Sequence, residues 1–272
     1  MQKTKFALSI VSAAALLTLA ACGGGGGDSA PATQQPATPT PPAPTITVNG
    51  SATAVSADPL AFVFVPVDAT SNGLSARAGA TATAPASLQA TTAEGAYKTI
   101  AGNAASAISL TSGTIADVTG SGQFSIGRWT NGATSVGSIN ANQGAHYVVG
   151  RPIALNRVAG PTATLTCSLQ SATLPTAVSG NFPAGKLNSA TAVINLNGPL
   201  VDTLSLDISI GSDRVVKTFS GAGVTGVNLS ASGTLLAETL GSDQAKPYLA
   251  IGYTVASQSS GDVSGAIVFA CQ

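Results

Sequence analysis

The sequence has little charge, few aromatic residues and few of the side chains that most often take part in catalysis. Of its 272 residues, 8% are charged and 4% are aromatic, and the chain has one histidine and three cysteines. No run of Lys and Arg occurs, which argues against the basic patch that nucleic-acid binding needs. No spacing of His, Cys and carboxylates is typical of a zinc site. We therefore expect no nucleic-acid partner, no metal and no cofactor.

Long apolar segments are also missing, apart from one near the N-terminus. Lys3 and Lys5 precede an almost wholly apolar segment, residues 6–19, which is shorter than the roughly 20 residues that a membrane-spanning helix needs. A basic start, a short apolar core and the small residues that follow are typical of a signal peptide. We assign this signal peptide to residues 1–21.

A cysteine stands directly after this segment. The tetrapeptide LAAC, residues 19–22, resembles the lipobox of bacterial lipoproteins. The resemblance implies that the Cys22 thiol receives a diacylglyceryl group, that the signal is removed, and that the new amino group is acylated with a fatty acid such as palmitate. A thiolate is the nucleophile that such a thioether requires, and several acyl chains together give stable anchoring. The alternative is an ordinary signal peptide followed by a chance cysteine.

The residue after the cysteine indicates which membrane holds the lipid anchor. In enterobacterial lipoproteins an Asp at this position tends to hold the protein in the inner membrane, whereas Gly23 follows Cys22 here. The resemblance therefore favours a lipid anchor in the outer membrane and leaves the periplasmic and cell-surface faces open. Residues 22–44 comprise the cysteine, a glycine run and a proline-rich stretch, a composition typical of a flexible, water-exposed tether.

From residue 45 onward, short alternating runs recur between turn residues, with almost no helical periodicity. The clearest alternation lies in residues 200–210, where the side chains of one face are Leu204, Leu206, Ile208 and Ile210. Residues 61–67 are apolar throughout, as in a strand buried on both faces. The dipeptides that begin at Asn131 and Asn197 are Asn-Gly pairs, which predict hairpin turns.

These patterns predict an all-β protein. We expect an antiparallel, up-and-down β-barrel-like domain of about eight strands in residues 111–272. Residues 45–110 are expected to form an N-terminal β extension or a small subdomain, and the pattern there does not separate these two alternatives.

The other two cysteines predict a disulfide. Cys167 and Cys271 alternate with apolar residues on the first and last strands of the C-terminal half, and an exported pair of cysteines is typically oxidised. A disulfide requires Cα atoms within roughly 7 Å, which closure of the sheet would provide by making these strands neighbours. The alternative is a pair of buried free thiols.

Four segments in the second half of the chain resemble the C-terminal β-barrel modules of certain proteobacterial envelope proteins. Some of these modules follow a FecR-type domain, and others belong to surface lipoproteins similar to transferrin-binding protein B. The segments that show the resemblance are residues 124–132, 145–152, 180–196 and 252–269. The resemblance implies an antiparallel barrel with little or no catalytic chemistry, and no FecR-type N-terminal domain is recognisable in this chain.

Few residues qualify as a functional site. His146 suits a strand histidine on the sheet, and the sharper alternative is an axial haem ligand together with Tyr147. Trp129 is expected to close one end of the barrel or pack over its base, with a binding role as the alternative. Arg128 and Arg151 are expected near the same end. A hydrolase would need a nucleophile elbow, and the sequence has no G-x-S-x-G motif.

The leading hypothesis is therefore an outer-membrane lipoprotein that acts as a non-catalytic binding or structural module. Membrane lipid through Cys22 and a protein in the cell envelope are its expected partners. The first alternative is a carrier of haem or of a small apolar molecule, because an eight-stranded barrel can just enclose one. The second alternative, an envelope hydrolase, is the least favoured.

Overall fold

The computed structural model describes residues 45–68, 76–160, 162–230 and 233–272. The expected signal peptide, Cys22 and the tether to residue 44 lie outside the described residues. The chain divides into residues 1–42 and 43–272, and everything below concerns the second unit. Its helices, all short 3-10 turns in the described part, are η1 (Ala76–Ala78), η2 (Ala86–Leu88) and η3 (Ala104–Ser106). No helix in the described ranges is long and apolar enough to cross a membrane.

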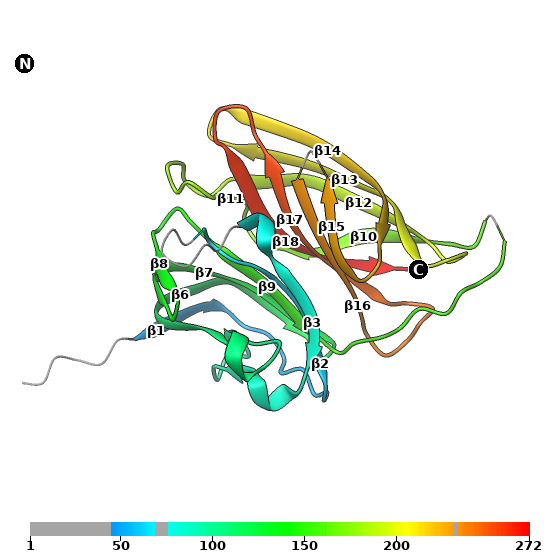
Figure 1. Ribbon diagram of the computed structural model, residues 1–272, viewed down its shortest axis with the longest axis horizontal. Helices are drawn as coiled ribbons and strands as arrows, with labels where there is room; N and C mark the ends of the chain where they lie inside the picture. Colours follow the sequence, from blue (N-terminus) through cyan, green and yellow to red (C-terminus); the bar gives the residue numbers. More distant parts are fainter. Residues whose placement is uncertain (1–44, 69–75, 161, 231–232) are drawn as a thin grey trace, which may run out of the picture. The chain divides into compact units, whose positions relative to one another are not determined.

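The first half of the unit forms a nine-stranded sheet that curls into a half-barrel (Figure 1). Its main path runs in the order β3-β2-β9-β7-β6-β5-β4, with β1 parallel to β6 and β8 antiparallel to β7. The strands are β1 (Ile46–Gly50), β2 (Leu60–Val65), β3 (Ala80–Ala84), β4 (Ala90–Thr91), β5 (Tyr97–Ile100), β6 (Ile108–Ser121), β7 (Phe124–Thr134), β8 (Gly137–Ile139) and β9 (Ala145–Gly150).

The second half forms a nearly closed, up-and-down barrel of eight strands, to which the short β11 adds at β18. The order is β14-β13-β12-β10-β18-β17-β16-β15, so the first strand, β10, pairs with the last, β18. The strands are β10 (Thr164–Ala172), β11 (Thr176–Ala177), β12 (Lys186–Asn195), β13 (Leu200–Ile210), β14 (Asp213–Gly223), β15 (Gly226–Ser230), β16 (Gly233–Leu240), β17 (Tyr248–Ala256) and β18 (Asp262–Cys271). The predicted all-β barrel-like fold is confirmed.

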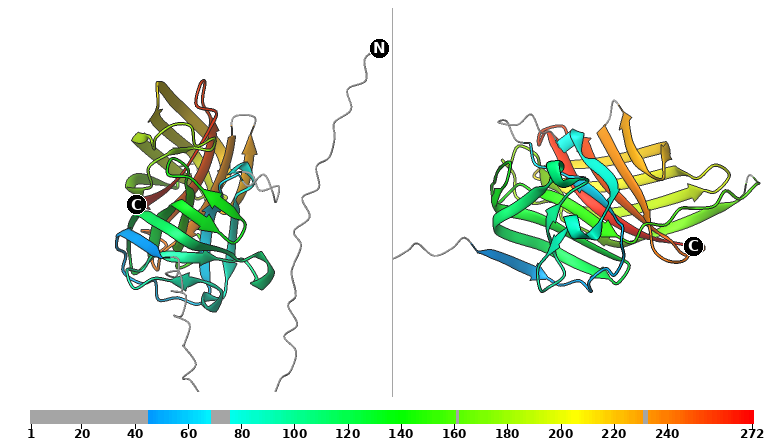
Figure 2. Two further views of the ribbon diagram at one scale, coloured as in Figure 1. Left: turned by 90° about the vertical axis from the view of Figure 1, so that its left-hand side faces the viewer. Right: turned by 60° about the horizontal axis from the view of Figure 1, so that its bottom comes forward.

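The boundary between the two sheets differs from the expected one. Residue 110, where the extension was expected to end, lies inside β6. Strands β6 to β9 pair with β2 and β5, and the chain changes sheet between Gly150 and Thr164. The N-terminal part is therefore a half-barrel of its own that extends to residue 150. Figure 2 shows the two curved sheets from two further sides.

The two cysteines lie where closure of the barrel places them. Cys167 of β10 and Cys271 of β18 are direct cross-strand partners, with Cα atoms 4.0 Å apart, and they form a disulfide. The predicted pairing of the first and last strands is confirmed. The disulfide therefore fixes the register at the point where the sheet closes on itself.

The alternation in residues 200–210 also appears as predicted. Leu204, Leu206, Ile208 and Ile210 are at most 1% exposed and belong to the core inside the barrel. The turn predicted at Asn197 joins β12 to β13. Period-two patterning thus predicted the buried face, and the Asn-Gly pair predicted the connection, in this part of the chain.

Strand β2 explains how the two sheets pack. All six residues of Leu60–Val65 are buried, as its apolar sequence predicted. Phe62 and Phe64 point into the half-barrel core, whereas Val63 and its odd-numbered neighbours join a third core that includes Leu236 and Val268 of the barrel. One outer wall of the barrel is therefore buried against the half-barrel.

The expected hairpin at Asn131 is wrong. Asn131 and Gly132 lie within β7, and the chain turns after Thr134. Asn131 has φ 49°, and the register against β6 shifts here. A Cβ on Gly132 would lie 1.9 Å from the carbonyl oxygen of Ser112. The Asn-Gly pair thus supplies a left-handed residue and a close backbone approach for a β-bulge rather than a turn.

Candidate functional site

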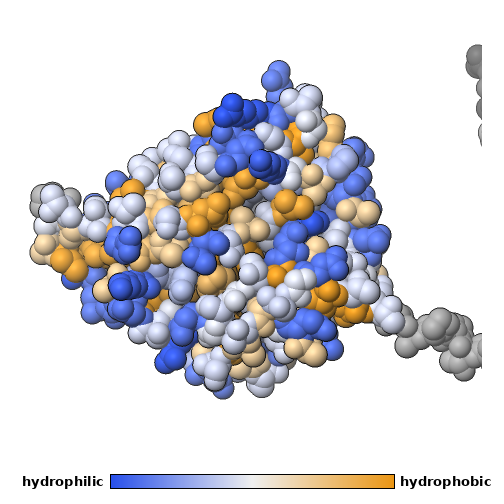
Figure 3. All heavy atoms as spheres, turned by 180° about the vertical axis from the view of Figure 1, so that it is seen from behind, coloured by the Kyte–Doolittle hydropathy of each residue, from blue (hydrophilic) through white to orange (hydrophobic). Residues whose placement is uncertain are grey.

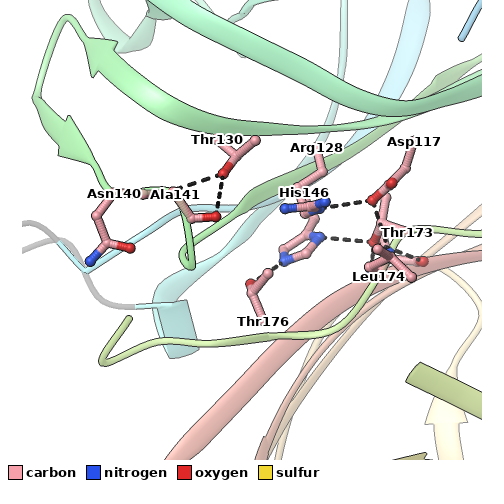
Figure 4. A network of polar contacts seen from close by, with 10 residues as sticks. Asp117, Arg128, Thr130, Asn140, Ala141, His146, Thr173, Leu174 and Thr176 are labelled. Carbon is pink, nitrogen blue, oxygen red and sulfur yellow. Dashed lines mark hydrogen bonds and ion pairs between the residues drawn. The ribbon is translucent and has the colours of Figure 1, made fainter. Parts of the chain in front are cut away.

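A polar cluster that joins several elements lies where the half-barrel meets the barrel. It contains the chain's one histidine, His146 of β9, opposite Arg128 of β7. Directly opposed residues of antiparallel strands project from the same face of the sheet, so both side chains point toward the barrel. Thr173 and Thr176, which follow β10, meet them from the barrel side (Figure 4).

Both ring nitrogens of His146 are used. The side chain is fully buried, with Nδ1 2.8 Å from the Thr173 hydroxyl and Nε2 2.9 Å from the Thr176 hydroxyl. The Thr173 hydroxyl also accepts from the Ala266 N–H at 3.0 Å and lies 3.3 Å from the Ala266 carbonyl. The network is satisfied when Nδ1–H donates to Thr173, Thr173 donates to Ala266, and Thr176 donates to Nε2.

The charge beside the histidine is also paired. Arg128 is 5% exposed, and its Nε donates to Asp117 Oδ2 at 2.8 Å. The same carboxylate oxygen accepts from the backbone N–H of Leu174 at 2.9 Å. Burial, and to a lesser degree the Arg128 charge, hold the pKa of His146 well below its ordinary value of 6.5. The imidazole is therefore neutral at neutral pH and serves as a hydrogen-bond bridge between the two sheets.

The other two predicted site residues point away from His146. Tyr147 and Trp129 belong to the core inside the half-barrel. The Trp129 Nε1–H donates to the Tyr97 carbonyl at 2.8 Å, and the Tyr147 hydroxyl accepts from the Tyr97 N–H at 3.1 Å. Their rings pack together, with centroids 6.3 Å apart, and Phe64 lies 5.3 Å from Trp129.

The structure thus separates the residues that the sequence grouped. His146 and Tyr147 occupy opposite faces of β9, so they do not converge on one ligand as an axial pair would. Trp129 fills the half-barrel core, and the expectation that it covers an end of the barrel is wrong. Arg128 lies in the junction between the sheets, while Arg151 is exposed beyond β9.

Sequence reasoning missed Asp117, Thr173 and Thr176. Asp117 has φ 57° in a bulged part of β6, which aims its carboxylate at the junction. Thr173 lies in the connection after β10 and Thr176 begins the short strand β11, and nothing in the local sequence pattern marks either residue. Only the pairing of β7 with β9 brings Arg128 and His146 together, and the register of that pairing cannot be predicted from a single sequence.

A second titratable group is buried at the same junction. Glu238 of β16 is 9% exposed and is opposite Ala250, a residue of the core shared by the two sheets. Desolvation raises its pKa to about 7, although a hydrogen bond with Thr81 of β3 offsets part of this rise. In the described ranges, no three His, Cys, Asp or Glu side chains cluster as metal ligands would.

Two hollows of the described structure are further candidate sites. An apolar cavity of about 210 Å³ opens in the half-barrel beside Phe62, Phe64, Ile100 and Ile108. A larger groove of about 430 Å³ lies between β14 and β15 of the barrel. Comparison of the chain with protein-family models, with curated proteins and with solved structures finds no match.

Proposed function

We propose that this protein is an outer-membrane lipoprotein, anchored through Cys22, whose β-domain acts as a non-catalytic binding or structural module of the cell envelope. The observation that best supports a non-catalytic role is the position of His146. A general base must reach the proton that it abstracts, whereas both ring nitrogens of this histidine are bonded to threonine hydroxyls in a buried junction.

The disulfide supports an exported location. Cys167 and Cys271 pair in the folded domain, which suits an oxidising compartment outside the cytoplasm. Only Cys22 then remains for lipid attachment, as the lipobox resemblance implies. Membrane lipid and a protein of the envelope are the partners of this proposal.

Replacement of Cys22 tests the anchor. The full chain and its Cys22→Ala variant are expressed in a bacterial host, and membrane and soluble fractions are separated. We expect the wild-type protein in the outer-membrane fraction with an N-terminal mass increase from acyl chains, and the variant in the soluble periplasmic fraction. A Cys167→Ser/Cys271→Ser control should keep the acyl chains. A Cys22→Ala variant that remains on the membrane would refute the proposal.

A second candidate function is a carrier of a small apolar molecule. The apolar cavity beside Phe64 favours it, because ligand sites are typically concave and mostly apolar. Trp129, the chain's one tryptophan, packs on Phe64 and reports on this cavity by its fluorescence. Titration of the mature protein with decanol should shift this fluorescence saturably, and Ala82→Phe, which narrows the cavity, should abolish the shift. An unchanged spectrum would count against a carrier.

A further inference from the structure

Among the strands that the structure describes, one pair of neighbours in the barrel forms no hydrogen-bonded ladder, and the barrel is open there. Every successive pair along the path is hydrogen-bonded, and β18 returns to β10, but β14 and β15 are joined by a turn without forming a ladder. Both strands are labelled in Figure 1. Near the turn, the Asn228 side chain bonds both the N–H and the carbonyl of Gly223. The groove of about 430 Å³ occupies this opening, which we call the seam.

The two edges of the seam differ in length. Strand β14 spans eleven residues and pairs only with β13, while β15 spans five and pairs only with β16. Within the described part of the chain, no backbone hydrogen bond joins another segment to the seam edge of Arg214–Ala222. An open edge of this length presents a row of backbone donors and acceptors that match only another extended chain.

Exposed apolar side chains border the outer side of the seam. Val216 of β14 is 68% exposed, and Val227 and Leu229 of β15 are 49% and 76% exposed. These are three of the six large hydrophobic side chains that are clearly exposed in the described ranges. Figure 3 shows the face of the molecule opposite to that of Figure 1, on which hydrophobic residues lie among hydrophilic ones. An apolar side chain on the outer side of an added strand would contact this border.

The inner side of the seam is basic. Lys217 is opposite Leu206, a residue of the barrel core, so its side chain starts from the inner face of β14. It lines the groove with Phe219 and Asn228. Lys217 forms no ion pair with the residues that the structure describes. An acidic side chain on the inner face of an added strand would meet this lysine.

We propose that the seam binds an extended segment of another envelope protein, which adds antiparallel to β14 with apolar side chains outward and an acidic side chain inward to Lys217. A second copy of this chain fits less well, because pairing of two seams would bring two Lys217 side chains into one groove. The inference deepens the binding role proposed above and rests on it.

Selection of peptides tests the seam without knowledge of the natural partner. A phage-displayed library of random ten-residue peptides is selected against the biotinylated mature protein, and enriched peptides are synthesised. We expect alternating apolar and polar sequences that contain Asp or Glu. They should slow hydrogen exchange in β14, and methylation of alternate backbone nitrogens in the peptide should abolish binding.

A charge reversal provides the sharpest comparison. Lys217→Glu should raise the Kd of the acidic peptides about tenfold, and exchange of the peptide's acidic residue for Lys should restore binding to this variant. Lys98→Glu, the same change in β5 of the half-barrel, should leave the Kd unchanged. Circular dichroism and the intact disulfide verify that each variant is folded.

Four results would overturn the inference. The inference is contradicted if the selection enriches no peptide, or if the enriched peptides bind equally well to Lys217→Glu. It is also contradicted if protection from hydrogen exchange is confined to strands other than β14 and β15. A concentration-dependent dimer that Leu229→Lys abolishes would show that a second copy occupies the seam. These outcomes leave the Cys22 experiment untouched, so failure of the seam and failure of the lipid anchor are distinguishable.

Discussion

Replacement of Glu238 by Gln should stabilise the protein in a strongly pH-dependent way. Glu238 is buried at the junction of the two sheets, and its pKa is raised from 4.5 to about 7. The unfolded chain ionises this carboxyl from about pH 4.5 upward, whereas the folded chain resists ionisation until about pH 7. Stability is therefore lost as the pH rises through this window. Gln has nearly the same shape, keeps an acceptor for Thr81 and never ionises.

The magnitude follows from the two pKa values. Each pKa unit is worth 1.36 kcal/mol, so the ionised Glu238 costs about 3 kcal/mol above pH 7 and almost nothing at pH 4. Urea unfolding of wild type and Glu238→Gln at pH 4, 6 and 8 measures this difference. We expect the free energies of unfolding to diverge by about 3 kcal/mol between pH 4 and pH 8, in favour of the variant.

A second buried group, His146, also makes the stability depend on pH, but it does not disturb this comparison. Burial lowers the pKa of His146, so the folded protein loses stability as the pH falls below 6.5. Both proteins contain His146, and the effect cancels in their difference. A stability difference that is the same at pH 4 and pH 8 would refute the assignment of a raised pKa to Glu238.

Three further predictions concern the junction and the barrel. Asp117→Ala leaves the buried Arg128 guanidinium without its partner and should lower the free energy of unfolding by about 3 kcal/mol, whereas Asp117→Ala/Arg128→Met should recover part of that loss in urea unfolding. Cys167→Ser/Cys271→Ser removes a disulfide between residues that are 104 positions apart in the sequence. It should lower the free energy of unfolding by about 2–5 kcal/mol, measured by urea unfolding, and an unchanged value would contradict the role of the bond in closing the barrel. Tyr253→Phe removes a buried hydroxyl that lacks a hydrogen-bond partner in the described structure. It should increase the free energy of unfolding by about 1 kcal/mol and so raise the thermal unfolding midpoint. A lower midpoint would show that the hydroxyl has a partner.

The parts of the fold that could be predicted are those in which a short pattern determines the answer. Alternation from Leu204 to Ile210 determines one buried face. The apolar run at β2 determines burial on two faces. Apolar alternation around Cys167 and Cys271, together with the expected export of the chain, predicted the closure of the barrel. Each of these inferences uses neighbours in the sequence or a covalent constraint.

The parts that escaped prediction depend on pairing between distant strands. The position of the sheet boundary follows from the pairing of β6 with β5 and of β9 with the distant β2. The bulge at Asn131 uses the same Asn-Gly chemistry as a hairpin, and only the partner strand separates the two outcomes. The junction around His146 combines β6, β7, β9 and the chain after β10, so no local window contains its residues together.

The disulfide and the seam occupy opposite positions in the circular order of the barrel. Strands β10, β12, β13 and β14 lead from the disulfide to the seam on one side, and β18, β17, β16 and β15 lead to it on the other. Closing a sheet normally removes the edges that invite unwanted pairing, and this barrel closes covalently at β10 and β18 while it leaves the eleven-residue edge of β14 open. The free edge of the half-barrel at β4 has only two residues, and that at β3 only five. Because the bond holds the far side of the barrel, the proposed addition of a strand at the seam would not separate β10 from β18, and a site that is rigid before binding loses less conformational entropy on binding.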